Sequence, residues 1–214
     1  MTVASADRAA ALRSRMVETQ LRRRGIEDER VLAAMERVPR EAFVPPAHAS
    51  HAYDDAALSI GEGQTISQPY IVAAMCSLLA LEGPERVLDV GTGSGYGAAV
   101  LDELAASVVS IERLEVLAGR ARAALHVTGH GAVEVRVGDG RLGAPDRAPF
   151  DAIAVAAATE RVPPALYDQL AVGGRLVLPR GGSRGQRLVR VVRTEQGAVE
   201  TASLGCRFVP LVAD

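Results

Sequence analysis

Short apolar runs alternate with longer helix-patterned segments from about residue 68 to residue 180, and this alternation constrains the fold most. The strand-like runs are RVLDV, SVVSIE, AVEVRVGD, FDAIAVAAA and GRLVLP, and segments of helical periodicity separate most of them. Parallel strands need crossover connections of about this length, so the pattern predicts helices on both faces of a parallel sheet. The following RLVRVVRTEQGAVETASL alternates like a hairpin. The predicted fold class is therefore α/β, with a doubly wound, mostly parallel, Rossmann-like sheet and a C-terminal antiparallel hairpin.

The first 67 residues have a different pattern, which predicts an N-terminal helical and extended segment. Apolar residues at helical spacing, including Leu12 and Met16, indicate a first helix that ends at Gly25. Asp28 is suited to cap a second helix, which stops before Pro39. The stretch that follows has three prolines and few periodic apolar residues, so we expect an ordered but irregular crossing. We therefore divide the chain into residues 1–67, on the substrate side, and a compact core of residues 68–214.

Composition excludes several classes of protein. All 24 basic residues are Arg, so neither a P-loop nor a pyridoxal Schiff base, each of which needs a Lys, can form. The net charge of −2 gives no basic field for nucleic acid or an anionic membrane. The two cysteines lie far apart without a C-x-x-C motif, and neither a signal peptide nor a long apolar span is apparent. We expect a cytoplasmic monomer with no disulfide, no metal and no membrane partner.

The glycine-rich loop after the first core strand is the main cofactor signal. It reads D-x-G-x-G-x-G from Asp89 through Gly91 and Gly93, with Tyr96 where a dinucleotide-binding loop would have its third glycine. A carboxylate at Asp89 would repel a pyrophosphate but would suit a cationic ligand. S-adenosylmethionine is such a ligand, because it carries a sulfonium and an α-amino group, and glycines would let the backbone approach it closely.

Two further acids follow the next two strands. Glu112 ends the second strand, where an acid commonly accepts hydrogen bonds from ribose hydroxyls in doubly wound folds. Asp139, followed by Gly140 in the sequence GDG, comes after the third strand, and its carboxylate could meet the adenine amino group. The three acids together predict S-adenosylmethionine as the cofactor, although any one of them alone could be a loop cap.

At this point the chain resembles a known family, the protein-L-isoaspartate O-methyltransferases. The resemblance rests on GQTISQPYIVAAM (63–75), VLDVGTGSGYGAAVL (87–101), VVSIER (108–113), GDG (138–140), FDAIAV (150–155) and the closing RFVPLV. It implies a class I methyltransferase fold and methylation of the free α-carboxylate of L-isoaspartyl residues in damaged peptides and proteins. It also implies that Ser67 is the active-site serine and that Asp89, Glu112 and Asp139 bind the cofactor. Gly97 and the LSIGEG approach depart from the family pattern beside the site.

The residues before the 68–81 helix suit an anionic substrate. A carboxylate is ionised near pH 7, so its attack on a sulfonium methyl needs alignment rather than a general base. Free N–H groups at the helix start, with Thr65, Ile66 and Ser67, would form the substrate-binding position. Equally, Ser67 could act only as the cap of that helix.

Other hypotheses stay open at this stage. A methyltransferase of the same family could esterify an ordinary aspartate of a biosynthetic peptide and so form an aspartimide. A non-catalytic nucleotide-binding module or a dehydrogenase is a further alternative, disfavoured by Tyr96 and by the TISQP segment. The histidines lie in pairs without a third ligand, and Cys76 and Cys206 have no histidine partner in a recognisable motif. We interpret these residues as structural.

Overall fold

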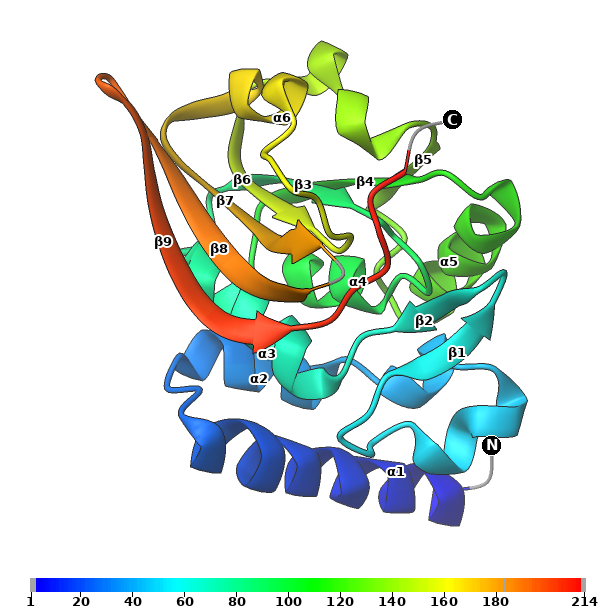
Figure 1. Ribbon diagram of the computed structural model, residues 1–214. Helices are drawn as coiled ribbons and strands as arrows, with labels where there is room; N and C mark the ends of the chain where they lie inside the picture. The colour runs from blue at the N-terminus through cyan, green and yellow to red at the C-terminus, as the bar shows by residue number, and fades with distance from the viewer. Residues whose placement is uncertain (1–2, 183, 213–214) are drawn as a thin grey trace.

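A seven-stranded sheet forms the centre of the molecule (Figure 1). The computed structural model describes residues 3–182 and 184–212, with side chains from residue 7 onward. The strand order is β5-β4-β3-β6-β7-β8-β9, parallel from β5 through β7 and antiparallel for β8 and β9. The bounds are β3 Arg86–Val90, β4 Ser107–Glu112, β5 Glu134–Val137, β6 Phe150–Val155, β7 Leu170–Gly182, β8 Gly185–Thr194 and β9 Gly197–Cys206. The predicted fold class is confirmed.

Helices cover both faces of the sheet because neighbouring strand residues point to opposite sides. In β3, Val87 packs into one apolar cluster and Leu88 into a second cluster on the other face. The first cluster takes in residues of α3 (Pro69–Leu79), α4 (Tyr96–Asp102) and α5 (Glu115–Val127). The second includes Leu166 of α6 (Pro164–Asp168). The fully buried strands therefore read as near-continuous apolar runs.

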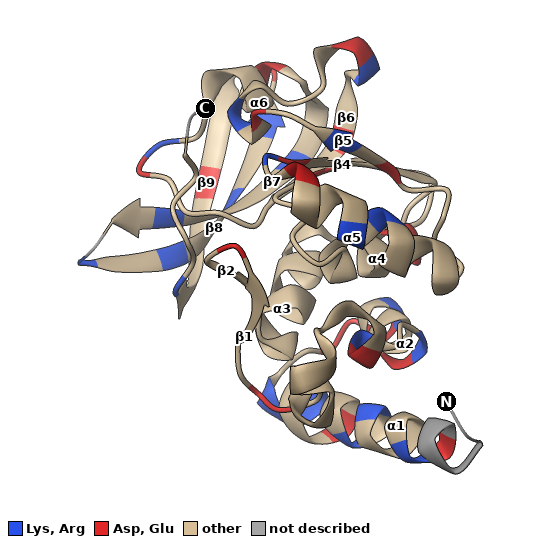
Figure 2. Ribbon diagram, turned by 90° about the vertical axis from the view of Figure 1, so that its right-hand side faces the viewer, with Lys and Arg blue, Asp and Glu red and all other residues tan. Residues whose placement is uncertain are grey.

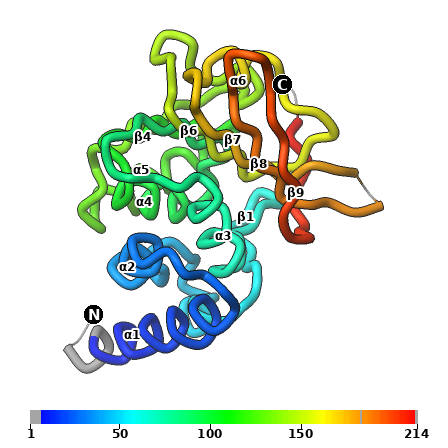
Figure 3. Tube along the Cα trace, turned by 90° about the vertical axis from the view of Figure 1, so that its left-hand side faces the viewer, coloured from blue at the N-terminus to red at the C-terminus, as the bar shows by residue number. Residues whose placement is uncertain are grey.

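The N-terminal helices lie beneath the α3 side of the sheet (Figures 1 and 3). Helix α1 (Val3–Met16) continues through a π-helical turn and a 3₁₀ turn to Gly25, whose φ of 91° ends it as predicted. Helix α2 (Glu29–Arg37) begins at Asp28, whose side chain accepts from the N–H groups of Arg30 and Val31. Residues of these helices belong to the same apolar cluster as α3. The division at residue 67 stays a prediction.

Three expectations were wrong in detail. The crossing before α3 contains two 3₁₀ segments, η3 (Arg40–Phe43) and η4 (Pro46–His51), and an antiparallel hairpin of β1 (Leu58–Gly61) and β2 (Gln64–Ile66). Its tight turn uses positive φ at Gly61, Glu62 and Gly63. The two strands are too short for their side chains to show an alternating pattern in the sequence. The sequence VPPALYDQLA (162–171) predicts a longer helix than α6, which has only 5 residues. Strand β7 runs for 13 residues, beyond the expected GRLVLP, because it pairs with β8 along its extension.

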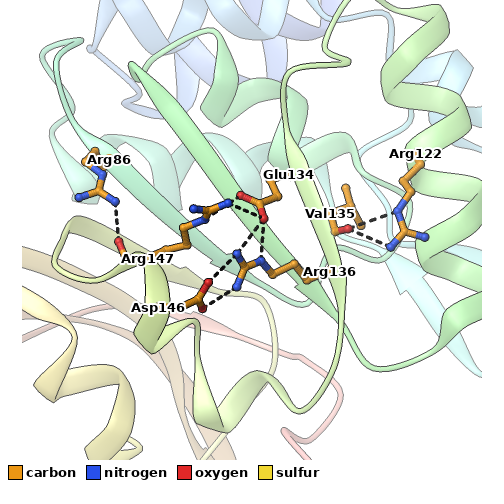
Figure 4. Close-up of polar contacts among 7 residues, drawn as sticks. All are labelled: Arg86, Arg122, Glu134, Val135, Arg136, Asp146 and Arg147. Atoms are coloured by element: carbon orange, nitrogen blue, oxygen red, sulfur yellow. Dashed lines mark hydrogen bonds and ion pairs between the residues drawn. The ribbon is translucent and has the colours of Figure 1, made fainter.

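Positions of basic and acidic residues are interspersed along the ribbon (Figure 2). At the sheet edge, Glu134 of β5 pairs with Arg136 and Arg147, and Arg136 also pairs with Asp146 (Figure 4). Such charges protect an edge strand from pairing with another chain. Within the described residues, no helix is long and apolar enough to cross a membrane.

Candidate active site

A deep cavity opens at the carboxyl ends of β3, β4 and β6, where ligands bind in doubly wound folds. Its empty space, which includes the solvent at its open mouth, is about 1180 Å³. Five stretches and Gly140 build the wall: the β2–α3 segment, the glycine loop, the end of β4, the end of β6 and the C-terminal tail. Of the predicted site residues, the lining contains Thr65, Ile66, Ser67, Asp89, Gly91, Gly93, Glu112 and Gly140.

Asp89 lies at the floor of this cavity and is 4% exposed. Its Oδ2 accepts a hydrogen bond from Ser110 Oγ at 2.6 Å, and Ser110 Oγ lies 2.5 Å from Thr92 Oγ1. Because the Ser110 proton goes to Asp89, Thr92 donates to Ser110. Burial raises the pKa of Asp89 to about 6, while the Ser110 bond opposes that rise and nearby Glu112 adds to it. The cavity thus contains an acid whose pKa lies near neutral pH and whose oxygens can accept further hydrogen bonds.

Glu112 anchors the glycine loop from the end of β4. Its Oε2 accepts from Gly93 N at 2.8 Å, and its Oε1 accepts from Leu114 N at 3.0 Å. Gly91 and Gly93 have φ values of 96° and 54°, so the loop needs residues that tolerate the left-handed region. Each carboxylate oxygen can accept a further bond, which leaves Glu112 able to hold a hydroxyl donor.

Asp139 and Gly140 differ in what they do. Gly140 lines the cavity, and a Cβ there would lie 2.5 Å from Val90 Cγ1, so its lack of a side chain keeps the loop close. The Asp139 carboxylate caps the 3₁₀ turn η5 (Gly140–Leu142) by accepting from Arg141 N and pairs with the Arg141 guanidinium at 2.6 Å. This hydrogen bonding lowers the pKa of Asp139. A direct contact of Asp139 with a ligand stays a prediction.

Ser67 does not cap α3, so the capping interpretation was wrong. The residue at the cap position is Gln68, with Pro69 as the first helical residue, and no side-chain bond caps this end. The Ser67 carbonyl instead accepts from Arg40 Nη2 at 2.8 Å. The Ser67 side chain therefore lies in the wall of the cavity without a helix-capping bond.

A second cavity adjoins the first, and we call it the peptide groove after the substrate that the sequence resemblance implies. Its wall shares Thr65, Ser67, Ala156 and Val209 with the deep cavity. The residues that line it are Ala57, Thr65, Ser67, Gln68, Ile71, Ala156, Arg207, Phe208 and Val209. Thr65 and Ser67 thus stand where the two cavities meet.

The sequence did not assign a site role to the C-terminal tail, whose residues 209–212 line the deep cavity. Gln186 of β8 holds this tail by accepting from Phe208 N at 2.7 Å and donating to Phe208 O at 3.1 Å. Ala158 adds two backbone bonds, to Val209 O and from Leu211 N. Only RFVPLV marked this stretch in the sequence, and nothing in it indicates which strand the tail would cross.

Cysteines and histidines have the structural settings that we expected, with one difference. Cys76 lines the cavity, but burial raises the pKa of its thiol to about 12, which keeps it protonated. The sequence favours exposed or turn positions for the histidines, but His130, directly after the turn that follows α5, is buried, and its Nδ1 lies 2.9 Å from Asp102 Oδ2. No group of three or more metal-ligating side chains occurs in the part of the chain that the structure describes.

Comparisons with known proteins bear on the family of the chain. The family model of the protein-L-isoaspartate(D-aspartate) O-methyltransferases (PCMT) matches residues 12–214. A curated relative, protein-L-isoaspartate O-methyltransferase 1 of Rhodopseudomonas palustris (strain HaA2), is 55% identical over 207 residues, which are 96% of this chain and 84% of the relative.

Solved structures agree with the fold. A protein-L-isoaspartate O-methyltransferase superposes with a TM-score of 0.84 at 29% identity, over 94% of this chain and 66% of the other. A proposed beta-aspartate methyltransferase (PCMT) from Plasmodium falciparum, in complex with S-adenosyl-L-homocysteine, gives a TM-score of 0.81 at 24% identity, over 94% and 98% of the two chains. The resemblance seen in the sequence is confirmed, and the chain belongs to the protein-L-isoaspartate(D-aspartate) O-methyltransferase family.

Proposed function

We propose that this protein transfers a methyl group from S-adenosylmethionine to the free α-carboxylate of L-isoaspartyl residues in damaged peptides and proteins. Membership of the family makes the chain an S-adenosylmethionine-dependent methyltransferase. The observation that carries the assignment of residues is the junction at Thr65 and Ser67, where the deep cavity meets the peptide groove. A methyl donor in the first and a peptide in the second would bring their reacting atoms together there.

The residues of the deep cavity fit the cofactor chemically. Asp89, once ionised, would accept from the α-amino group, and the free lone pairs of Glu112 would accept from ribose hydroxyls. Gly91 and Gly93 have no side chains, so a ligand can approach the backbone closely on that wall, and their positive φ values favour glycine at both positions. We propose a supporting role for Asp139 through the loop that presents Gly140. When bound, the cofactor supplies an electrophilic methyl group on a sulfonium.

The peptide side would hold the accepting carboxylate in line with that methyl group. The carboxylate is ionised at neutral pH, so it needs no general base. The hydroxyls of Thr65 and Ser67, with the backbone around Ile66, would orient it, and alignment of this kind can supply roughly 7–11 kcal/mol. Ser67 is the proposed catalytic residue because it lines both cavities.

The ester explains how methylation leads to repair. The backbone nitrogen that follows the isoaspartyl linkage attacks the methyl ester carbonyl, a five-membered succinimide closes, and methanol leaves with the nitrogen's proton. Water then opens the ring to aspartyl or isoaspartyl products. Repeated cycles would deplete the isoaspartyl form, and these later steps need no group from the enzyme.

A pair of twin peptides tests this function. The purified protein is offered labelled S-adenosylmethionine with an isoaspartyl peptide or with its aspartyl isomer. We expect strong preference for the isoaspartyl peptide, because a displacement of about 1 Å at the reacting centre can reduce the rate on the order of a hundredfold. A base-labile ester and then a succinimide should appear in mass spectra. Preference for the aspartyl form of one peptide would instead favour the biosynthetic alternative.

We also propose that the protein acts as a cytoplasmic monomer without a nucleic-acid partner. The net charge of −2 and the interspersed charges support this, because a nucleic-acid surface needs a concentrated basic field. Light scattering at micromolar concentration should give the mass of one chain, about 22.4 kDa. A mass of two chains, or retention on a nucleic-acid column at physiological salt, would overturn this part of the proposal.

A further inference from the structure

Arg40 is buried behind the active site with no exposed surface, and among the described residues it is the largest fully buried side chain by volume. Its guanidinium donates from Nε to Ala52 O at 2.7 Å and from Nη2 to Ser67 O at 2.8 Å. The remaining nitrogen, Nη1, is buried without a hydrogen-bond partner. Arginine stays charged in proteins, so this side chain brings a full positive charge into the core.

No carboxylate within the described ranges pairs with this charge. The charged group lies over the ring of Tyr96, 4.8 Å from its centroid, and burial is the main cause that lowers the pKa of Arg40. Removing an unpaired ion from water costs several kcal/mol even after relaxation of the protein. In other proteins, replacing a buried ion by an apolar side chain of similar volume is often neutral or stabilising, so stability alone does not explain Arg40. Its contacts connect it to the site instead.

Two of the three residues that Arg40 contacts belong to the wall of the deep cavity. Ser67 lies on the peptide side, and Tyr96 follows the glycine loop on the cofactor side. The charged residues in that wall include two acids, Asp89 and Glu112, and the exposed Arg113. The two acids suit a cationic cofactor but repel an anionic peptide carboxylate. A buried cation behind Ser67 would offset that repulsion in a region of low dielectric constant.

The hydrogen bond to Ser67 offers a route for this effect. A charged donor on the Ser67 carbonyl polarises the peptide unit that it shares with Gln68, and so strengthens the Gln68 N–H as a donor. Gln68 lines the peptide groove, next to Ser67. The same bond also fixes the backbone from which the Ser67 hydroxyl projects.

We propose that Arg40 is a positioning residue for the methyl acceptor: it fixes the Ser67–Gln68 peptide unit and supplies the positive charge that lets an anionic carboxylate bind beside two acids. This inference rests on the proposed function of the site. It assigns Arg40 to the peptide substrate rather than to the cofactor, so substitution of Arg40 should impair the reaction with the peptide and leave the cofactor dissociation constant nearly unchanged.

Kinetics of Arg40→Met test the proposal. We expect kcat/KM for an isoaspartyl peptide to fall by about 10- to 100-fold, the range for loss of a charged hydrogen bond. The dissociation constant for S-adenosylhomocysteine, measured by calorimetry, should change by less than about twofold. Arg40→Lys should recover part of the peptide KM, because it keeps the charge, but not the full kcat, because one ammonium cannot reproduce the fork between the Ala52 and Ser67 carbonyls.

Arg193→Met is the matched control. Arg193 also donates to backbone carbonyls, those of Tyr167, Asp168 and Leu170, and also lies over a tyrosine ring, 5.4 Å from the centroid of Tyr167. These residues lie around α6, outside both cavities. This control should shift the melting temperature without changing the peptide KM.

Three results would overturn the role of Arg40. They are an unchanged peptide kcat/KM in folded Arg40→Met, equal losses of cofactor and peptide binding, and equal kinetics for the Met and Lys variants. If Arg40→Met does not fold, Arg40→Lys carries the test through its kcat and KM against those of the wild type. A wild-type protein that methylates no isoaspartyl peptide would refute the proposed function instead, and that result is read before any variant is compared.

Discussion

The hydroxyl of Ser110 lies 2.6 Å from the carboxylate of Asp89, one strand away in the sheet, and donates its proton to it. This bond favours the ionised acid, yet burial outweighs it and the pKa of Asp89 rises to about 6. The acid that we propose to bind the cofactor as an anion therefore has a pKa close to neutral pH.

Cofactor binding should weaken in mild acid. Below pH 6 the Asp89 carboxyl must lose a proton before it can pair with an α-amino group. The dissociation constant for S-adenosylhomocysteine should therefore rise about tenfold for each unit by which the pH falls below 6. Calorimetry between pH 4.5 and pH 8 measures this rise. In Asp89→Asn the rise should be absent, and an equally steep rise in that variant would assign the titration to another group.

Asp89→Asn should stabilise the free protein at pH 7 while weakening cofactor binding. The folded pKa lies above the unfolded value of 3.8, so this group contributes stability below pH 4 that is lost as the pH rises through 6. The stability lost by the wild type between low pH and pH 7 is on the order of 3 kcal/mol, and the asparagine variant, which has no ionisable group there, does not lose it. Cofactor affinity should fall by about 1.5–3 kcal/mol, the range for a charged hydrogen bond.

Denaturant unfolding at pH 4 and pH 7 separates these effects. The wild type should lose stability relative to Asp89→Asn between the two values. The surface variant Asp146→Asn is the control, because pairing with Arg136 lowers the pKa of that acid and its pH dependence has the opposite sign. A parallel pH response of wild type and Asp89→Asn would contradict the assigned titration.

Glu112→Gln should loosen the glycine loop. Both carboxylate oxygens accept backbone bonds, from Gly93 and Leu114, and an amide can accept only one of them. We expect a loss of about 1.5–3 kcal/mol of stability and weaker cofactor binding. Hydrogen exchange at the Gly93 amide should accelerate. Unchanged exchange and an unchanged dissociation constant would show that the carboxylate does not anchor the loop.

Ser67→Ala should reduce methyl transfer to the peptide while leaving the cofactor dissociation constant unchanged. Because Gln68 rather than Ser67 occupies the cap position of α3, the melting temperature should also stay within about 1–2 °C of the wild type. Ser59→Ala, an exposed serine of β1 whose hydroxyl bonds only weakly to Gly61 N, is the control. Full turnover by Ser67→Ala would remove this serine from the catalytic mechanism.

Gln186→Ala should loosen the attachment of the C-terminal tail to the sheet, because among the described residues only the two backbone hydrogen bonds of Ala158 described above would then hold it. The variant loses both bonds to Phe208, so the wall made by residues 209–212 would become less ordered. We expect a higher KM for the peptide, by about fivefold to tenfold, and faster hydrogen exchange from residue 208 onward. Gln196→Ala, in the exposed turn between β8 and β9, should leave both quantities unchanged.

Periodicity predicted the core elements because each of them buries a whole face. The strands β3 and β4 and the helices α3 and α5 lie close to their expected positions. The hairpin β1–β2 was missed because its strands have 4 and 3 residues and its turn depends on positive φ at Glu62, a residue that gives no turn signal. Local patterns of this length contain too few residues to show a period.

The site was predictable wherever chain order determines position in space. Asp89 and Glu112 end neighbouring parallel strands, so they had to meet at one edge of the sheet. Asp139 follows the same rule, but its carboxylate is held by Arg141, two residues away, a local bond that competes with any ligand. Arg40 could not be predicted, because arginine is almost never fully buried and its contacts come from residues 52, 67 and 96.

The wall of the deep cavity has an uneven origin along the chain. One part comes from a single stretch of about 25 residues, 89–114, while the face shared with the peptide groove combines residues near 65 and near 208. Mutations in the two distant stretches can therefore accumulate without disturbing the contiguous one. Over evolutionary time, a lineage could change the shared face, and with it the carboxylates that we propose it accepts, while it inherits the sequence of the proposed methyl-donor stretch unchanged.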